Sequence, residues 1–244
     1  MKIHFWGVRG SIPCPIQSSQ IQAKINACIQ RITPQDLIDF DSRQRFIASL
    51  PDWIYGTVGG DSPCVQLITK SGKELILDAG SGMRVLGKNT EIPEDQHYSL
   101  FFSHFHWDHI CGFPFFDHAY NPNVKIDIYS PFENANEFLA LQMPSLNLFP
   151  VLWENFSRNF EFHTLDTSKT YYIDGLEINC CKMSHPGSSY SYSFKEDGKK
   201  FVWTMAAWPM LKSLELCTQE NKLRAEKLIK QGQLKIHALP FTTH

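Results

Sequence analysis

The sequence lacks the spaced cysteine pairs, the long apolar runs and the charge excess that would each assign it to a broad class. Its seven cysteines show no CxxC spacing, and the segment MKIHFWGVRG has no charged stretch followed by an apolar one. We therefore expect reduced thiols and a cytoplasmic location. No run approaches the roughly 20 apolar residues that span a bilayer, so we expect no membrane partner. Lys plus Arg number 23 against 25 for Asp plus Glu, a net charge of −2, so charge does not indicate a nucleic acid as partner.

The patterns that are present predict a strand-rich chain with interspersed helices. With 244 residues, the chain is long enough to bury a core without metal or disulfide support. Apolar and alternating runs predict strands at 1–8, 64–69, 74–78, 98–103, 124–129, 161–165, 176–182, 189–194 and 200–204. Helical spacing predicts helices at about 16–32, from Thr33-Pro34 onward, at 132–141 and at 211–230. The first two of these helices form an insertion, at about 16–50, ahead of the main body.

A dense group of metal-binding side chains follows the expected strand 98–103. In the stretch SHFHWDHICGFP, the residues His104, His106, Asp108 and His109 fall within six positions. His104 and His106 share a side of an extended backbone, and a helix that begins near Asp108 would turn that residue and His109 toward the same point. Imidazole and carboxylate ligands suit Zn, Mn or Fe. The stretch therefore predicts a metal site rather than a set of structural histidines.

A further histidine follows a strand in the second half of the chain. His185 lies in SHPGS, after the expected strand 176–182. A site with three histidine ligands often takes one of them from a distant segment. We therefore expect His185 to complete the ligand set of His104 and His106.

These motifs together resemble the metallo-β-lactamase superfamily. HFHWDH matches its HxHxDH signature, and Asp78 in LDAGSG and His185 in SHPG match its flanking motifs in order and spacing. FWGVRGSIP and VGGDSPC are similar to the branch that includes cyclic-phosphate phosphodiesterases and the tRNA 3′-processing endonuclease. The resemblance covers about residues 1–204, and Asp61 stands where asparagine is usual.

The resemblance implies an α/β (α+β) fold, the αββα metallo-β-lactamase-type sandwich, with metals at the edge between its sheets. His104, His106 and His185 would hold one metal, and Asp108 and His109 would act in catalysis as ligands of a second. Asp78 would not bind a metal itself but would orient the metal ligands through hydrogen bonds. The implied activity is metal-dependent hydrolysis of phosphodiesters, in which a metal-bound hydroxide attacks phosphorus. A small-molecule or nucleotide phosphodiester would be the substrate.

The chain departs from the family pattern after residue 204. The family has an aspartate that bridges both metals where this chain has Met205, and a thioether does not replace a carboxylate between two dications. The last metal-binding histidine of the family is also not recognisable; His237 and His244 lie in another context. We therefore expect a domain at 1–204 with an incomplete second half, and a divergent tail at 205–244. We expect one tightly bound Zn or Mn and a weakened second site. An uncovered sheet edge also favours self-association into a homo-oligomer.

Alternative interpretations follow from the same departures. The chain is either an active phosphodiesterase, or a degenerate relative that binds metal without hydrolysis, or a hydrolase of thioesters or lactams on the same fold. Arg9 and Ser11, in the turn after the first strand, are the candidates for substrate binding, because an arginine there could reach a phosphate. An ordinary turn arginine is the alternative for Arg9.

Overall fold

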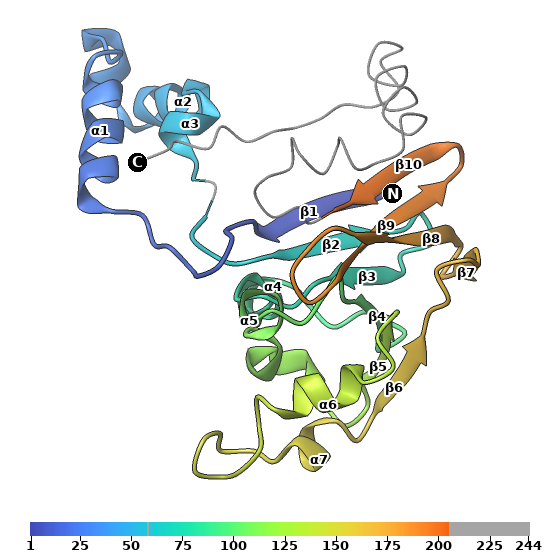
Figure 1. Cartoon of the computed structure of the whole chain (residues 1–244). Helices are drawn as coiled ribbons and strands as arrows, with labels where there is room; N and C mark the ends of the chain where they lie inside the picture. Colours follow the sequence, from blue (N-terminus) through green and yellow to red (C-terminus); the bar gives the residue numbers. More distant parts are fainter. Residues whose placement is uncertain (58, 205–244) are drawn as a thin grey trace.

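Two β-sheets lie face to face in this computed structural model, which describes residues 1–57 and 59–204 (Figure 1). The first sheet has six strands in chain order: β1 (Lys2–Gly7), β2 (Cys64–Ile68), β3 (Glu74–Leu77), β4 (His97–Phe101), β5 (Lys125–Ser130) and β6 (Phe160–Thr164). The second has four, paired in the order β10 (Lys199–Trp203), β9 (Ser189–Glu196), β8 (Leu176–Met183) and β7 (Tyr171–Ile173). The mixed sandwich confirms the expected fold class.

The described helices are all short. They are α1 (Ser18–Ile29), η1 (Pro34–Leu37), α2 (Phe40–Ser49), α3 (Asp52–Tyr55), α4 (Gly82–Asn89), α5 (Trp107–Ile110), η2 (Phe113–Phe115), η3 (Asp117–Tyr120), α6 (Ala135–Ala140) and α7 (Trp153–Phe156). Within the described ranges, no helix combines the length and the apolar character that crossing a membrane requires.

The direction of the strands determines where loops with functional side chains meet. β1, β2 and β3 pair antiparallel, whereas β3, β4, β5 and β6 pair in parallel. The carboxyl ends of β3 and β4 therefore lie at the same edge of the sheet. Asp78 follows β3 at this edge, and Ser103 and His104 follow β4.

The central strands β3 and β4 of the first sheet are buried on both faces, which explains why most of their residues are apolar. In β3, Leu75 and Leu77 pack into the core between the two sheets, while Ile76 packs with the helices on the outer side. β4 shows the same alternation, with Leu100 outside and Phe101 between the sheets. The outer core also contains residues of α4 and α6, so these helices form the outer layer.

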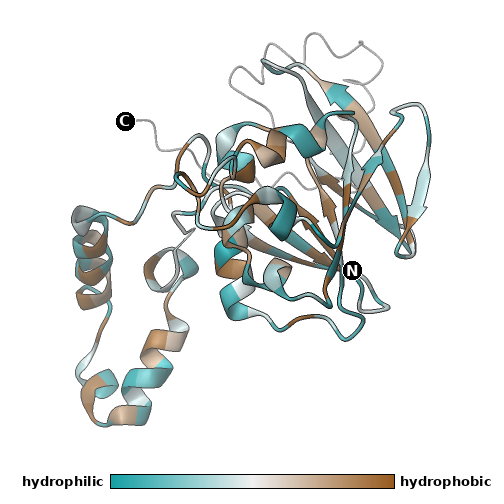
Figure 2. Ribbon diagram, turned by 90° about the horizontal axis from the view of Figure 1, so that it is seen from below, coloured by the Kyte–Doolittle hydropathy of each residue, from teal (hydrophilic) through white to brown (hydrophobic). Residues whose placement is uncertain are grey.

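The expected helical insertion is present as α1, η1, α2 and α3, and it projects to one side of the sheets (Figure 2). Thr33 and Pro34 do start a helix, but it is the four-residue 3₁₀ helix η1. The longer helix α2 starts anew after Asp39, whose side chain accepts a hydrogen bond of 2.7 Å from the Ser42 N–H. The helix expected from Thr33-Pro34 thus starts where predicted and is divided into η1 and α2, because a second N-cap interrupts it.

One other expected helix is shorter in the structure: the helix expected at 132–141 is limited to α6. The three-residue strand β7 and the helix α4 were not expected from the sequence. The helix expected at 211–230 and the departure at Met205 lie outside the described residues.

Candidate metal centre

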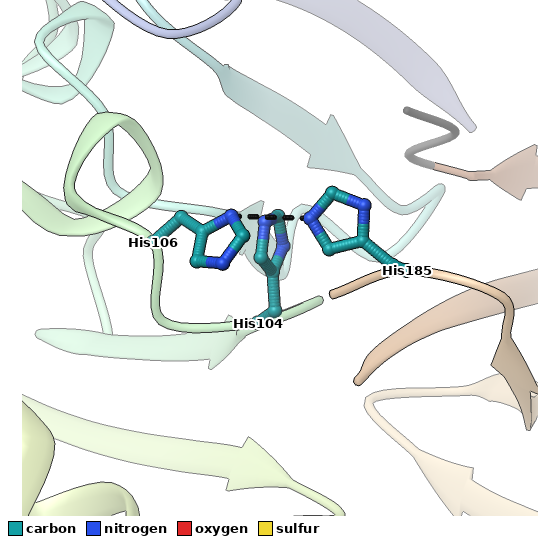
Figure 3. A group of neighbouring side chains, drawn as sticks. All are labelled: His104, His106 and His185. Carbon is teal, nitrogen blue, oxygen red and sulfur yellow. Dashed lines mark hydrogen bonds between the residues drawn. The ribbon is translucent and has the colours of Figure 1, made fainter. Parts of the chain in front are cut away.

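Four histidine rings converge at the carboxyl end of β4. The ring centroid of His104 lies 4.5 Å from that of His106, 4.1 Å from that of His109 and 4.5 Å from that of His185. The possible ligand atoms of His104, His106 and His185 all lie within 4.8 Å of one another. Figure 3 shows these three rings facing one another, with His185 reaching in from the second sheet. The structure thus brings together the three residues expected to hold the first metal.

The orientation of His104 follows from a chain of hydrogen bonds. The Ser103 hydroxyl donates to Asp78 Oδ2 over 2.8 Å, because an ionised carboxylate can only accept. The hydroxyl proton is then engaged, so the 3.0 Å contact between Ser103 Oγ and His104 Nδ1 needs a proton on Nδ1. This tautomer leaves the lone pair of His104 Nε2 free. His104 is therefore presented as an Nε2 metal ligand.

Asp78 fixes His109 directly. His109 Nδ1 lies 3.0 Å from Asp78 Oδ2, and its Nε2 lies 3.5 Å from Asp108 Oδ2. Donation from Nδ1 to the buried carboxylate leaves Nε2 facing Asp108, so His109 and Asp108 form a pair beside His104. Asp78 also accepts from the backbone N–H of Ser103 over 2.7 Å and from the indole N–H of Trp203 over 2.9 Å. The sequence indicated Asp78 but gave no signal for Ser103 or Trp203.

His185 occupies the first position of a tight turn. Its carbonyl oxygen accepts a hydrogen bond of 3.0 Å from Ser188 N–H, with Pro186 and Gly187 between them. Gly187 has a φ of 76°, as the third position of a type II turn requires. Beyond the turn, the Tyr190 N–H donates to the Ser103 carbonyl oxygen over 2.9 Å. This bond joins β9 to the end of β4, which explains why a residue distant in sequence meets His104.

Electrostatics favours the neutral imidazole at His104 and at His185. Burial, together with the neighbouring His109, lowers the pKa of His104 to about 3. Burial also lowers the pKa of His185, and His106 adds to this effect. Burial opposes the charged form of His109 too, but the carboxylates of Asp78 and Asp108 outweigh it and raise its pKa. A neutral imidazole is the form that binds a metal.

The residues present fit one divalent cation. His104 is buried and His106 is exposed, so the cluster is anchored on one side and open to solvent on the other. His185 Nδ1 is buried without a hydrogen-bond partner among the described residues. Three imidazoles with an open side form the donor set of a catalytic zinc site. Asp108 and His109 offer ligands for a second ion, and residue 205, where the family has its bridge, lies outside the described residues.

The two candidate substrate-binding residues lie on the loop after β1. The backbone N–H of Ser11 donates to Asp108 Oδ2 over 2.7 Å, so Ser11 positions a residue of the centre. Arg9 donates from Nε to the carbonyl oxygen of Gly59 over 3.3 Å. Within the described ranges its two Nη groups make no hydrogen bond. Ser11 thus borders the centre through its backbone, and the Nη groups of Arg9 have no hydrogen-bond acceptor among residues 1–57 and 59–204.

The loop after β3 and the segment after α5 touch through their backbones. A Cβ on Gly112 would lie 1.9 Å from the carbonyl oxygen of Gly80, and Gly112 N–H donates to the Ala79 carbonyl oxygen over 2.9 Å. No rotamer change relieves a clash with backbone. We expect Gly112→Ala to lower the free energy of unfolding by about 3 kcal/mol in urea denaturation. A Cβ on Gly10 meets nothing within 4 Å. Gly10→Ala is the matched control and should change stability by less than about 1 kcal/mol; equal stability of the two variants would contradict the close approach.

Comparison with solved structures places this architecture among known folds. The short form of human tRNase Z is similar over 85% of this chain and 70% of that protein, with 15% identity and a TM-score of 0.51. Zn²⁺-bound PqqB from Methylobacterium extorquens has 10% identity, covers 71% of this chain and 64% of its own, and gives a TM-score of 0.48. The metallo-β-lactamase fold protein YhfI from Bacillus subtilis has 14% identity, coverages of 62% and 57%, and a TM-score of 0.46. The chain thus spans less than two thirds of the length of the last two proteins. No curated protein matches the sequence significantly.

The paired sheets, with a histidine cluster at their common edge, are those of a metallo-β-lactamase-fold protein. The sequence model of the family described as anti-Pycsar protein Apyc1 matches residues 64–238, which is more than half of the chain. The chain belongs to this family. The match continues past residue 204, where we expected the domain to end, into residues that the structure does not describe.

Proposed function

We propose that this protein is a metal-dependent phosphodiesterase that hydrolyses a cyclic nucleotide. The observation that carries the proposal is the convergence of three imidazoles on one open point beside the Asp108 and His109 pair. Membership of the anti-Pycsar family supports a cyclic-nucleotide-degrading role. Its action in the cytoplasm belongs to the proposal as well, and rests on the composition of the sequence.

The side chains of the centre indicate which metal ions would bind and which residues would hold them. His104, His106 and His185 would hold Zn²⁺ or Mn²⁺, and a second ion would take ligands from Asp108 and His109. Such an ion supplies Lewis acidity, which acidifies water and offsets negative charge on phosphoryl oxygens.

The protein groups around this point have separate tasks. Asp108 accepts a hydrogen bond at Oδ2 from the Ser11 N–H, which would orient this carboxylate toward a second ion beside His109. The Nη groups of Arg9 are suited to a phosphate oxygen, since a guanidinium binds phosphate with two parallel hydrogen bonds. Asp78 holds the imidazoles of His104 and His109 in fixed tautomers.

We expect purified protein supplied with Zn²⁺ or Mn²⁺ to hydrolyse bis(p-nitrophenyl) phosphate and nucleoside 3′,5′-cyclic monophosphates. His106→Ala should lower kcat/KM at least about 100-fold, equivalent to about 2.7 kcal/mol of transition-state stabilisation. His106 is exposed, so this change should leave the fold intact. The matched control is His4→Ala, because His4 is also exposed but lies on β1. This variant should retain full activity.

The same assay separates the alternatives. Metal binding without turnover of any phosphodiester would support a degenerate metal-binding protein and refute the proposed reaction. Faster hydrolysis of a thioester or a lactam than of every phosphodiester would show that the protein is a hydrolase with a different class of substrate.

A further inference from the structure

A second group of ligating side chains lies on the first sheet, away from the histidine centre. Asp127 on β5 and Glu161 and His163 on β6 have ligand atoms within 4.8 Å of one another. His97, which contacts this group, is the first residue of β4, whereas His104 follows the last residue of the same strand. The two groups share no residue. We call Asp127, Glu161 and His163 the sheet-edge triad.

Strand register explains how the sheet-edge triad forms. Asp127 pairs with Glu161 across the parallel ladder, and Tyr129 pairs with His163. Residues two apart on a strand share a face, so Asp127, Glu161 and His163 all project from one face of the sheet. The ring of His163 stacks on Tyr129 with centroids 4.7 Å apart, which restricts its orientation. β6 ends the order of the described strands, so the triad is accessible from that edge.

His163 is held close to two carboxylates without bonding to either. Its Nε2 lies 3.5 Å from Asp127 Oδ1 and 4.0 Å from Glu161 Oε1, and it is buried with no hydrogen-bond partner among the described residues. Two atoms that bind one Zn²⁺ at about 2.1 Å lie roughly 3.0–3.5 Å apart at common coordination angles. The separation of His163 Nε2 and Asp127 Oδ1 therefore suits a shared cation better than a direct hydrogen bond.

The surroundings of Asp127 also favour a cation. His97 Nε2 lies 3.0 Å from Asp127 Oδ2, so an imidazole holds the oxygen that points away from His163. This arrangement resembles the outer hydrogen bonds that orient metal-binding carboxylates. In the part of the chain that the structure describes, no lysine or arginine forms an ion pair with Asp127 or Glu161. Among the described residues, no lysine or arginine therefore neutralises the charge of these two carboxylates.

We propose that the sheet-edge triad is a second, independent metal site that binds a first-row divalent cation such as Zn²⁺. His163 and the carboxylates of Asp127 and Glu161 are the ligands, and His97 is a positioning residue. One imidazole with two carboxylates suits Zn²⁺ or Mn²⁺ better than Mg²⁺, which prefers oxygen ligands alone. Glu161 is mostly exposed, with a side chain at 75% of full accessibility. Affinity should therefore be lower than at the three-histidine centre.

Zn²⁺ titration of the full chain, after one equivalent has been bound, tests the proposal. The wild type should bind a further, weaker equivalent. His163→Gln should remove it, and Glu161→Gln should weaken it at least about 10-fold. Glu161 is exposed, so Glu161→Gln should fold, and this variant decides the outcome if His163→Gln does not fold. His4→Gln is the control and should bind like the wild type, and Mg²⁺ should not compete.

Two results would overturn the site. One is a wild type that takes up no further Zn²⁺ after the first equivalent. The other is a further equivalent that both triad variants retain but Asp108→Asn loses, which would assign it to the centre beside His109. Neither result depends on hydrolysis, so the proposed function is tested separately.

Discussion

Asp78→Asn is expected to lower the free energy of unfolding by about 4 kcal/mol and to weaken metal binding 10- to 100-fold. Asp78 is fully buried and accepts hydrogen bonds from Ser103, His109 and Trp203. Asparagine has the same shape but offers one oxygen and an NH₂ group, so a donor would face a donor. The charge that raises the pKa of His109 would also be lost. Urea denaturation and equilibrium dialysis with Zn²⁺ measure the two effects.

The backbone does not contribute to this loss, because asparagine tolerates the left-handed conformation of Asp78, whose φ is 57°. Asp174 provides a matched control, since it has a φ of 51° and accepts one hydrogen bond, from the Ser99 hydroxyl, over 2.5 Å. An asparagine carbonyl can accept that bond equally well. Asp174→Asn should therefore cost less than about 1 kcal/mol. Similar losses in both variants would show that the buried carboxylate is not what holds the centre together.

The sequence was sufficient for the parts of the centre that are local. His104, His106 and His109 stand close together in the chain after a predictable strand, so a few backbone angles bring them to one point. The strands themselves were predictable, because the short apolar runs 75–77 and 100–102 are typical of strands that are covered on both faces. The fold class was expected from the resemblance of the motifs to the metallo-β-lactamase superfamily, and the structure confirms it.

Contacts that depend on register and on side-chain direction could not be predicted. Trp203 reaches Asp78 from the far end of the second sheet, and one apolar residue in a strand does not indicate a buried indole hydrogen bond. The sheet-edge triad has the same origin, because Asp127 meets Glu161 only through the parallel pairing of β5 and β6. The division of the second helix has a local reason. The Asp39 side chain accepts a hydrogen bond from the Ser42 N–H and so caps a new helix, α2, after η1.

Whether the centre holds one tight metal or two depends on ligands that must come from several segments. His185 is the only member of the three-histidine set that the second sheet contributes, through the turn at Pro186 and Gly187. Its imidazole is only partly buried, so its removal should not unfold the domain. Asp108 and His109 remain for a second ion, but Met205 stands where the resemblance to the metallo-β-lactamase superfamily leads us to expect a bridging carboxylate. The second position should therefore be weak.

We expect the purified wild type to retain about one tight equivalent of Zn²⁺ or Mn²⁺, and His185→Ala to lose it with at least a roughly 100-fold fall in affinity. Loss of an outer hydrogen bond alone costs 10- to 100-fold in affinity, so loss of a direct ligand should cost more. Elemental analysis after dialysis against a weak chelator measures both proteins. Glu161→Gln, which changes only the sheet-edge triad, should keep the tight equivalent. Retention of the metal by His185→Ala would remove this residue from the ligand set. Two tight equivalents in the wild type, one of them lost in Asp108→Asn, would mean that another residue bridges the ions in place of the missing aspartate.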